Sequence, residues 1–129
     1  MTHTTHDIGV ASQIGKYSDA IEVRSNMRWL ITSGTPGISA AGKLPEDFVG
    51  QAELAWQNVA NVLAKADMTA ANIVKVTQYL TRADDIKAYT GIRTRFLGDH
   101  RPAAMLLVVP QLVWPKILIE VEIIAAKAV

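Results

Sequence analysis

The chain of 129 residues contains no cysteine, so disulfides, thiolate nucleophiles and cysteine-bound metals are excluded. Charge of either sign is sparse: 13 basic and 12 acidic residues leave a net charge of +1, and no basic run marks a nucleic-acid surface. No apolar stretch is long enough to span a membrane, and the polar segment Met1–Ser12 lacks the apolar centre of a signal peptide. These absences predict a soluble cytoplasmic domain that binds neither nucleic acid nor membrane.

Hydrophobic residues are abundant, at 50% of the chain. A small soluble monomer needs fewer, so we expect part of the excess to cover an interface between copies. The length predicts a single domain over residues 1–129, with residues 1–12 as a flexible polar tail. His3 and His6 lie three apart in that tail and His100 is distant, and a loose tail is the simpler interpretation than a metal site.

Two helices are predicted by apolar spacing. The first covers residues 46–66, and its buried stripe is expected to consist of Phe48, Ala52, Ala55, Val59, Val62 and Ala66, widened by Trp56 and Leu63. The second covers residues 83–97, with Gly98 closing it and Pro102 preventing its continuation.

Strands are predicted on either side of these helices. Residues 17–23 and 27–32 are rich in β-formers and flank Arg24-Ser25-Asn26, a spacing typical of a hairpin. Residues 73–80 alternate as a third strand after a turn at residues 69–72. Trp29 and Trp56 are both expected in the core, whereas Trp114, between two prolines, could line a cleft or pack against another copy.

The pattern of the last part of the chain predicts two strands joined by a loop between Pro110 and Pro115. Residues 103–109 are apolar on both faces, which indicates a strand covered on both sides. Residues 117–125 alternate, so Glu120 and Glu122 share one face of an otherwise apolar strand. Two carboxylates in that setting are unusual enough to mark a candidate site.

The predicted order is β-β-α-β-α-β-β, which gives an α+β fold with a single sheet and both helices on one face. The second face of the sheet then has no helix to cover it. Because the strand at residues 103–109 is wholly apolar, we expect that face to meet further copies in a cyclic homo-oligomer with pockets between subunits.

Five blocks along the chain also occur, in this order, in a known family. The blocks are Ile14-Gly15-Lys16-Tyr17, Ile31-Thr32-Ser33-Gly34, residues 74–80, His100-Arg101-Pro102-Ala103 and residues 119–125. Over residues 14–126 the chain resembles the Rid family, the reactive intermediate deaminases of YjgF type. The resemblance implies a chorismate-mutase-like fold and a homotrimer whose three intersubunit clefts bind a small metabolite. It also implies hydrolysis of enamines and imines, such as 2-aminoacrylate, to 2-keto acids and ammonia without cofactor or metal.

Carried over by position, the resemblance makes Glu120 the catalytic carboxylate. The substrate-binding positions that it implies are Tyr17, Ser33, Gly34, Thr90, Ala104, Met105 and Leu106. Thr90 stands where the family has an asparagine, and Ala104 stands where it has an arginine that grips the substrate carboxylate. Alanine can form neither of the charge-assisted hydrogen bonds of an arginine fork. We therefore expect the usual deaminase activity to be weak, altered or absent, with hydrolysis of a bulkier or less charged imine as the alternative.

Each of these residues has a second interpretation. Glu120 could orient or deprotonate a water, or it could be a strand carboxylate paired with Lys116 or Arg101. Tyr17 could bind a ligand or cap the core, and Ser33-Gly34 could present amides to an anion or serve only the turn. Glu122 is more readily explained as structural. Arg93 or Arg95, on the second helix, could replace the missing cation from a new direction.

Overall fold

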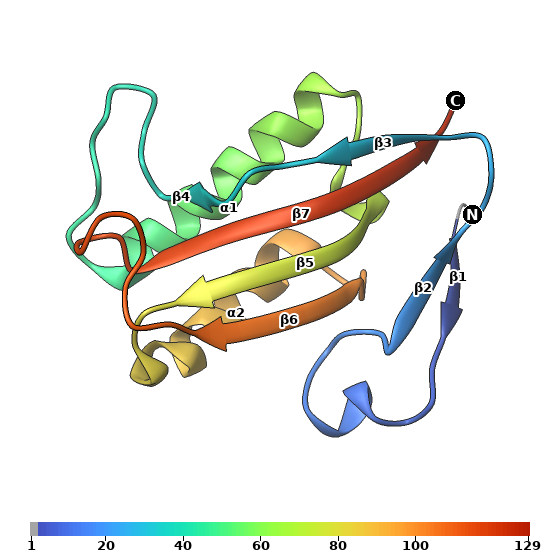
Figure 1. Ribbon diagram of the computed structural model, residues 1–129, viewed down its shortest axis with the longest axis horizontal. Helices are drawn as coiled ribbons and strands as arrows, with labels where there is room; N and C mark the ends of the chain where they lie inside the picture. Colours follow the sequence, from blue (N-terminus) through green and yellow to red (C-terminus); the bar gives the residue numbers. More distant parts are fainter. Residues whose placement is uncertain (1–2) are drawn as a thin grey trace.

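The computed structural model describes residues 3–129 as one layer of helices on one layer of sheet (Figure 1). The elements are β1 (His3–His6), β2 (Ala20–Val23), β3 (Met27–Ile31), β4 (Thr35–Pro36), α1 (Phe48–Lys65), β5 (Ile73–Leu80), α2 (Ile86–Leu97), β6 (Ala103–Val108) and β7 (Ile119–Ala128). The main sheet has the order β3-β7-β5-β6, and β4 also pairs with β7. Only the β5–β6 pair is parallel.

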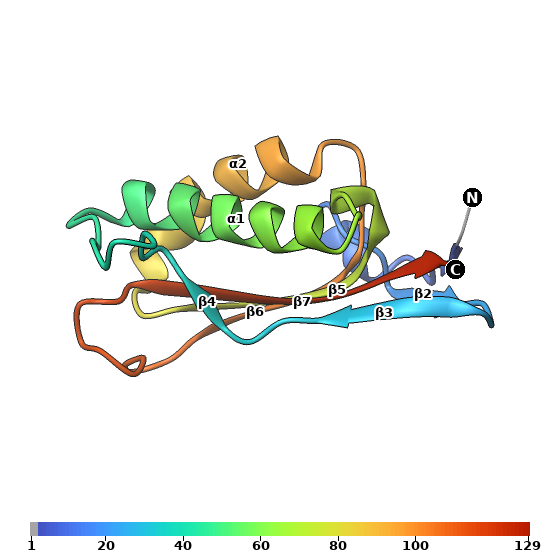
Figure 2. The ribbon, with the colours of Figure 1, turned by 90° about the horizontal axis from the view of Figure 1, so that it is seen from above.

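Both helices cover the same face of the sheet, as predicted (Figure 2). Helix α1 buries its apolar stripe, including Trp56 at 1% exposure, while Val62 lies at the margin of the stripe and is 37% exposed, contrary to the prediction. Helix α2 contributes Tyr89 and Ile92 to the same core, and Gly98 ends it with a positive φ of 59°. The core therefore lies between the helices and the inward side chains of β5 and β7.

The opposite face of the sheet carries no helix, and this overturns two expectations. Trp29 is 56% exposed because Leu30, its neighbour on β3, is the residue that packs on the core, so Trp29 points to the open face. Strand β6 is not covered on both sides, since Met105 and Leu107 on the open face are 53% and 37% exposed. The alternation of side chains along the strands correctly predicted which residues share a face, but not which of the two faces is buried.

The N-terminal part departs most from the prediction. Strand β2 does not form a hairpin with β3; it pairs with β1, from His3↔Val23 to His6↔Ala20, in a separate two-stranded ribbon. The described part of the expected tail therefore includes a regular strand, while Met1 and Thr2 lie outside the described residues. Figure 1 shows this ribbon beyond one end of the main sheet.

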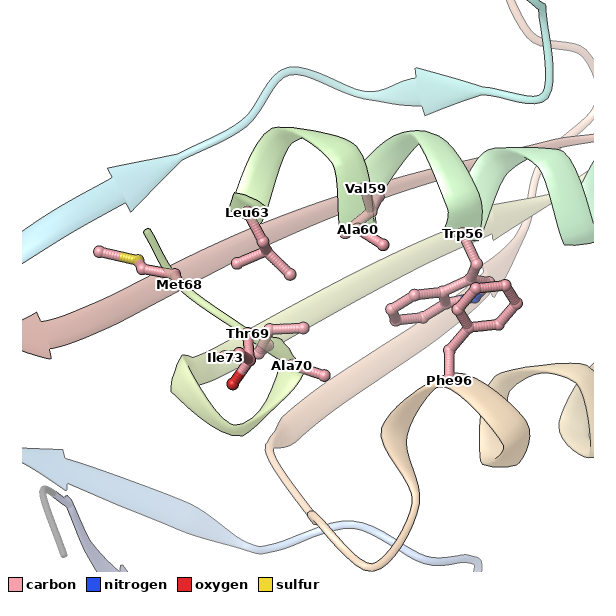
Figure 3. Close-up of a pocket in the computed structure, with 9 residues that line it drawn as sticks. All are labelled: Trp56, Val59, Ala60, Leu63, Met68, Thr69, Ala70, Ile73 and Phe96. Carbon is pink, nitrogen blue, oxygen red and sulfur yellow. The ribbon is translucent and has the colours of Figure 1, made fainter. Parts of the chain in front are cut away.

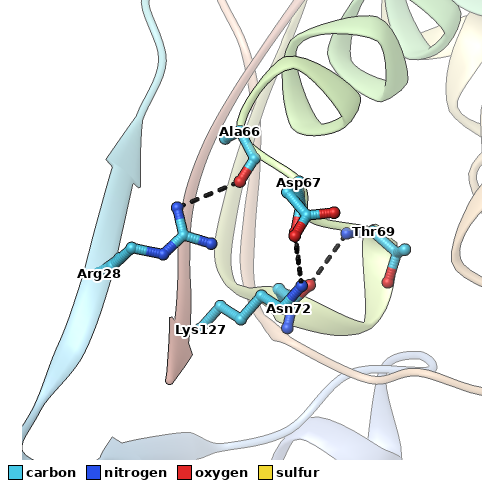
Figure 4. Close-up of polar contacts among 6 residues, drawn as sticks. All are labelled: Arg28, Ala66, Asp67, Thr69, Asn72 and Lys127. Atoms are coloured by element: carbon cyan, nitrogen blue, oxygen red, sulfur yellow. Dashed lines mark hydrogen bonds and ion pairs between the residues drawn. The ribbon is translucent and has the colours of Figure 1, made fainter. Parts of the chain in front are cut away.

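Polar contacts fasten the strand ends to the helix layer (Figure 4). Arg28 Nη1 donates to the carbonyl of Ala66, the C-cap of α1, at 3.1 Å, and Lys127 Nζ donates to the carbonyl of Asp67 at 2.6 Å. Cations at a helix C-terminus are favoured by the exposed carbonyls and the helix dipole. At the other end of the helix, Gln51 is fully buried and bridges the backbone of Pro45, Lys116 and Leu118.

Neither helix among residues 3–129 is long and apolar enough to cross a membrane.

Candidate functional site

Glu120 lies on the open face of the sheet, on β7 and beside the turn that follows β3. A β-carbon built on Gly34 would collide with Glu120 Oε1, so the absence of a side chain at residue 34 makes room for the carboxylate. Tyr79, on β5, lies opposite Glu120 in the register of β5 with β7, and the Tyr79 hydroxyl donates to Glu122 Oε1 at 2.7 Å. The two carboxylates thus share one surface but have different partners.

Burial raises the pKa of Glu120 above its ordinary value, and the charge of Glu122 raises it further. Within residues 3–129, neither Lys116 nor Arg101 forms an ion pair with Glu120, so no cation offsets these two effects. A half-buried carboxyl group with a raised pKa can take and return a proton near neutral pH more readily than a solvated one. The pKa of Tyr79 is raised as well, first by its hydrogen bond to Glu122.

Ser33 and Gly34 lie in the turn between β3 and β4, and both are exposed. The carbonyl of Ser33 accepts a hydrogen bond from Thr35 Oγ1 at 3.0 Å, which holds the turn. This turn and Glu120 therefore form one cluster on the open face.

A second cluster lies at α2 and the segment that precedes β2. A cavity of about 500 Å³ there is lined by Ile14, Gly15, Lys16, Thr90, Gly91, Arg93 and Thr94. Tyr17 follows this segment and is half-buried, and Thr90 Oγ1 donates to the carbonyl of Lys87 at 3.0 Å. Helix α2 covers one face of the sheet (Figure 2), and Glu120 lies on the other face because its neighbours Ile119 and Val121 are the residues in the core. One chain therefore does not bring these two clusters together.

Ala104 and Leu106 are placed against the apolar core, and Met105 projects from the open face. None of the three lines the α2 cavity. Ala104 and Leu106 therefore share one face of β6 while Met105 lies on the other, because successive side chains of a strand point to opposite faces. The methyl group of Ala104 offers no hydrogen bond in either direction.

A cation on α2 is nonetheless linked to this strand through a side chain of β5. Arg93 Nη1 donates to Gln78 Oε1 at 3.3 Å, and Gln78 Nε2 donates to the carbonyl of Met105 on β6 at 2.9 Å. Tyr89 also donates to Gln78 Oε1, at 2.5 Å, and the guanidinium of Arg93 lies 5.8 Å from the centroid of its ring. Arg95 is engaged elsewhere, in a 2.7 Å ion pair with Glu53 on α1. Of the two arginines, Arg93 is the one that contacts the sheet, through Gln78 on β5.

Gln78 was missed by the sequence analysis, although a signal was available. It is the only polar residue on the inward face of β5, between Val76 and Leu80, and it is fully buried. The carbonyl oxygen and the NH2 group of a buried amide both need hydrogen-bond partners, so such a side chain holds neighbouring elements in place. Here it joins α2 to β6.

Metal binding finds no support in the part of the chain that the structure describes, since no three His, Asp or Glu side chains there could hold one ion. A separate apolar cavity of about 250 Å³ lies between the two helices and the start of β5, where Trp56 stacks on Phe96 (Figure 3). None of the candidate site residues lines it.

The fold is a two-layer α+β fold with two carboxylates on the open face of its sheet. Comparison with known proteins identifies the family to which the chain belongs. Residues 9–127 match the family model described as Endoribonuclease L-PSP. A RutC family protein of Pasteurella multocida is 34% identical over 134 residues, covering 99% of this chain and 100% of that protein. The chain therefore belongs to the Rid/YjgF/RutC family.

Two further relatives place it within that family. TdcF of Escherichia coli K12, by name a candidate reactive intermediate deaminase, is 28% identical over 120 residues, covering 89% of each chain. The crystal structure of YyfB of Yersinia pestis, a Rid family protein of unknown function, has a TM-score of 0.87 at 25% identity, covering 98% of this chain and 100% of that one. Homology thus extends to deaminase candidates and to members without an assigned activity.

Proposed function

We propose that this chain forms a homotrimer that binds a small metabolite in the clefts between its subunits, with the usual enamine and imine deaminase activity weak, altered or absent. The observation that carries the proposal is the composition of the two clusters. One holds a carboxylate with a raised pKa beside an open turn, and the other holds Lys16, Thr90 and Arg93. Strand β6 has Ala104, which supplies no charge to either cluster. Each cluster is half of a site, and a second subunit would supply the other half.

Assembly through the open face follows from its composition. Trp29, Ile31, Met105 and Leu107 are apolar and exposed there, around a centre that contains Lys75, Thr77 and Glu122. Covering such a surface with further copies removes apolar area from water, at about 25 cal/mol per Å², and leaves polar groups at the seams. Three-fold closure is the arrangement that the family resemblance suggests.

Loss of the arginine weakens binding of a small amino-acrylate. Each charge-assisted hydrogen bond contributes roughly 1.5–3 kcal/mol, so loss of a fork lowers transition-state binding by about two to four decades. Arg93 restores a positive charge near β6, but it approaches from α2 and is already held by Gln78 and Tyr89. A ligand carboxylate would therefore be held differently, which favours a ligand of different shape.

The alternative is an imine or enamine hydrolase for a bulkier or less charged substrate. Glu120 then orients a water and accepts its proton as the oxygen adds to the imine carbon. Collapse of the resulting carbinolamine breaks the C–N bond and, with the proton returned to nitrogen, releases ammonia and a carbonyl compound. Ala104 supports this alternative over hydrolysis of the smallest imines, because its methyl group supplies no charge to hold a small carboxylate.

Measurement of turnover distinguishes the two hypotheses, metabolite binding with little activity and hydrolysis of a bulkier or less charged imine. Imines generated from several amino acids by an oxidase are supplied to the wild-type protein, Ala104→Arg and Glu120→Gln, and ammonia and keto-acid release are followed. We expect slow turnover of small imines by the wild-type protein and at least a tenfold increase in Ala104→Arg. Wild-type turnover equal to that of an arginine-bearing relative would refute the emphasis on Ala104.

Binding is measured separately with 2-keto acids as probes. Arg93→Ala is expected to weaken their affinity about tenfold, the effect of losing roughly 1.4 kcal/mol. Arg95→Ala is the matched control, because Arg95 is paired with Glu53 on the helix surface and should not alter affinity. Equal effects of the two substitutions would show that Arg93 holds no ligand.

A further inference from the structure

Two strand edges near the N-terminus are left without a partner. In residues 3–129, β3 pairs only with β7, and β2 pairs only with β1. The two open edges are joined by Arg24-Ser25-Asn26, and the sequence of this segment is typical of a hairpin that would pair them. Unpaired strand edges with exposed apolar side chains, such as Trp29 and Ile31, are templates for pairing with another chain.

Contacts at both ends of the ribbon hold it away from its own β3. The Ser18 amide donates to the carbonyl of Pro102 at 3.2 Å, and the Ser18 hydroxyl donates to the carbonyl of Arg101. At the other end, His3 Nε2 is 3.1 Å from the carbonyl of Ala126. Ser18 and His3 are both buried, at 5% and 7% exposure, so the ribbon is docked on the body of the chain rather than loose.

We propose that the β1–β2 ribbon of one copy pairs through β2 with the open edge of β3 of a neighbouring copy, so that the two chains form one continuous sheet. The local sequence favours pairing of β2 with β3, but the fold keeps the two strands of one chain apart. Under this condition identical subunits can exchange an element, so that the same pairing forms between two chains. The occupant of the β3 edge is thus a second copy of this chain.

The side chains of the two edges match in the register that the hairpin sequence encodes. Val23 then stands opposite Met27 of the neighbour, Glu22 opposite Arg28, and Ile21 opposite Trp29. The outer two pairs are apolar and the middle pair has opposite charges, and both kinds of cross-strand pair stabilise an antiparallel sheet. Glu22 and Arg28 are both exposed. Within one chain Glu22 is paired with His6 at 2.7 Å and Arg28 donates to the carbonyl of Ala66, so a pair between chains would form by sharing or exchanging these surface contacts.

The same register has a consequence for the site, and this step rests on the proposed function. Within the strands it places Ala20 opposite Leu30 of the neighbour. Extended past the start of β2 and the end of β3, the same spacing directs Tyr17 towards Ser33 of the neighbour. Tyr17 adjoins the α2 cavity, while Ser33 adjoins Gly34 and Glu120. Strand pairing between copies would therefore bring together the two clusters that a single chain keeps on opposite faces of its sheet.

Disulfide trapping tests the pairing directly, and the natural absence of cysteine makes every introduced thiol unambiguous. In Glu22→Cys/Arg28→Cys, mild oxidation is expected to give covalent dimers and larger species on non-reducing gels, reversed by reductant. The single variants Glu22→Cys and Arg28→Cys, with tags of different size, are co-expressed and should give a mixed disulfide dimer. The control Glu22→Cys/Trp29→Cys places the thiols on opposite faces and should not cross-link.

A disulfide confined to the monomer band would show that the hairpin closes within one chain and would overturn the proposal. Failure of both Glu22→Cys/Arg28→Cys and the second pair, Ile21→Cys/Trp29→Cys, to cross-link would do the same, as would equal cross-linking of the control. Should the variants not fold, hydrogen exchange of the wild-type protein is measured at several protein concentrations. Protection of the outward β3 amides that appears only as the protein assembles would support the proposal, whereas fast exchange at every concentration, or protection in the monomer, would overturn it. Cross-linking does not depend on turnover, so it can succeed while the proposed function fails, or the reverse.

Discussion

The carboxylate of Glu120 lies so close to Gly34 that a β-carbon at residue 34 would overlap its Oε1 atom. The contact joins the last strand to the turn after β3, and it fixes where the carboxylate of the candidate site can stand. Because the atom in the way is the end of a flexible side chain, a methyl group at residue 34 would move the carboxylate without breaking the backbone.

Gly34→Ala is therefore expected to displace Glu120 and leave the fold intact. The displaced carboxylate moves into solvent, so its pKa should fall from the raised value towards the ordinary one, with a loss of stability below about 1 kcal/mol. Carbon-detected NMR titration of the Glu120 carboxyl group measures the shift. An unchanged pKa with a folded protein would contradict the contact.

Glu120→Gln should change how stability depends on pH. Because the pKa of Glu120 is higher in the folded chain, the folded state binds a proton more tightly, and stability falls as pH rises from the ordinary carboxyl value through the raised one. Glutamine removes that loss. We expect the variant to match the wild-type protein below about pH 4 and to be the more stable of the two at neutral pH, as measured by urea unfolding at several pH values.

A stability difference that is the same at every pH would show that Glu120 is not desolvated in the folded protein.

Tyr89→Phe should be strongly destabilising, because the Tyr89 hydroxyl is fully buried and bridges two other buried groups. It donates to Gln78 Oε1 at 2.5 Å and accepts from Trp56 Nε1 at 3.1 Å. Its removal leaves the indole N–H without an acceptor, and the expected loss is about 2–4 kcal/mol. Denaturant unfolding followed by circular dichroism measures it.

Tyr79→Phe is the matched control for that substitution. It removes one hydrogen bond, to Glu122, at the half-exposed open face, so the loss should stay near 0.5–1 kcal/mol. Similar losses for the two tyrosines would mean that the Tyr89 network is less buried than described.

Asp19→Asn should loosen the segment that follows β1. Asp19 Oδ2 accepts from the Ile8 amide and Oδ1 from the Ala11 amide, each at 2.8 Å, and these hydrogen bonds hold the pKa of Asp19 below its ordinary value. A carboxyl group with a lowered pKa stabilises the fold above its ordinary pKa and loses that effect as pH falls through the lowered one. The wild-type segment should therefore loosen only in acid.

In Asp19→Asn the amides of Ile8 and Ala11 should exchange faster already at neutral pH, which hydrogen exchange read by NMR can measure residue by residue. Unchanged exchange at both amides would assign the order of this segment to other contacts.

Much of the fold could be predicted because its elements are long and periodic. The helix at residues 46–66, the strand at residues 73–80 and the single helical layer all follow from spacing, and the structure confirms them. The β2–β3 hairpin could not be judged from its own residues, since contacts of Ser18 and His3 with distant carbonyls decide where the ribbon lies. The prediction that Trp29 lies in the core was wrong, because the alternation of side chains along a strand does not indicate which face of the sheet the helices cover.

The candidate site was predicted only in part for the same reason. Glu120 was conspicuous as a charge on an apolar strand, and the structure places its carboxylate beside Gly34, a residue that the family resemblance assigns to the same site. The link from Arg93 through Gln78 to β6 depends on the approach of α2, which no local pattern encodes.

Strand β6 has a consequence for handling the protein. Ala103–Val108 is a run of six uncharged apolar residues at an edge of the sheet, paired along its outer side within residues 3–129 only where Ala103 meets Ser18. Such segments seed cross-β stacking when they are freed. Thermal inactivation should therefore be irreversible, and faster in concentrated than in dilute samples, with precipitation taking the place of refolding.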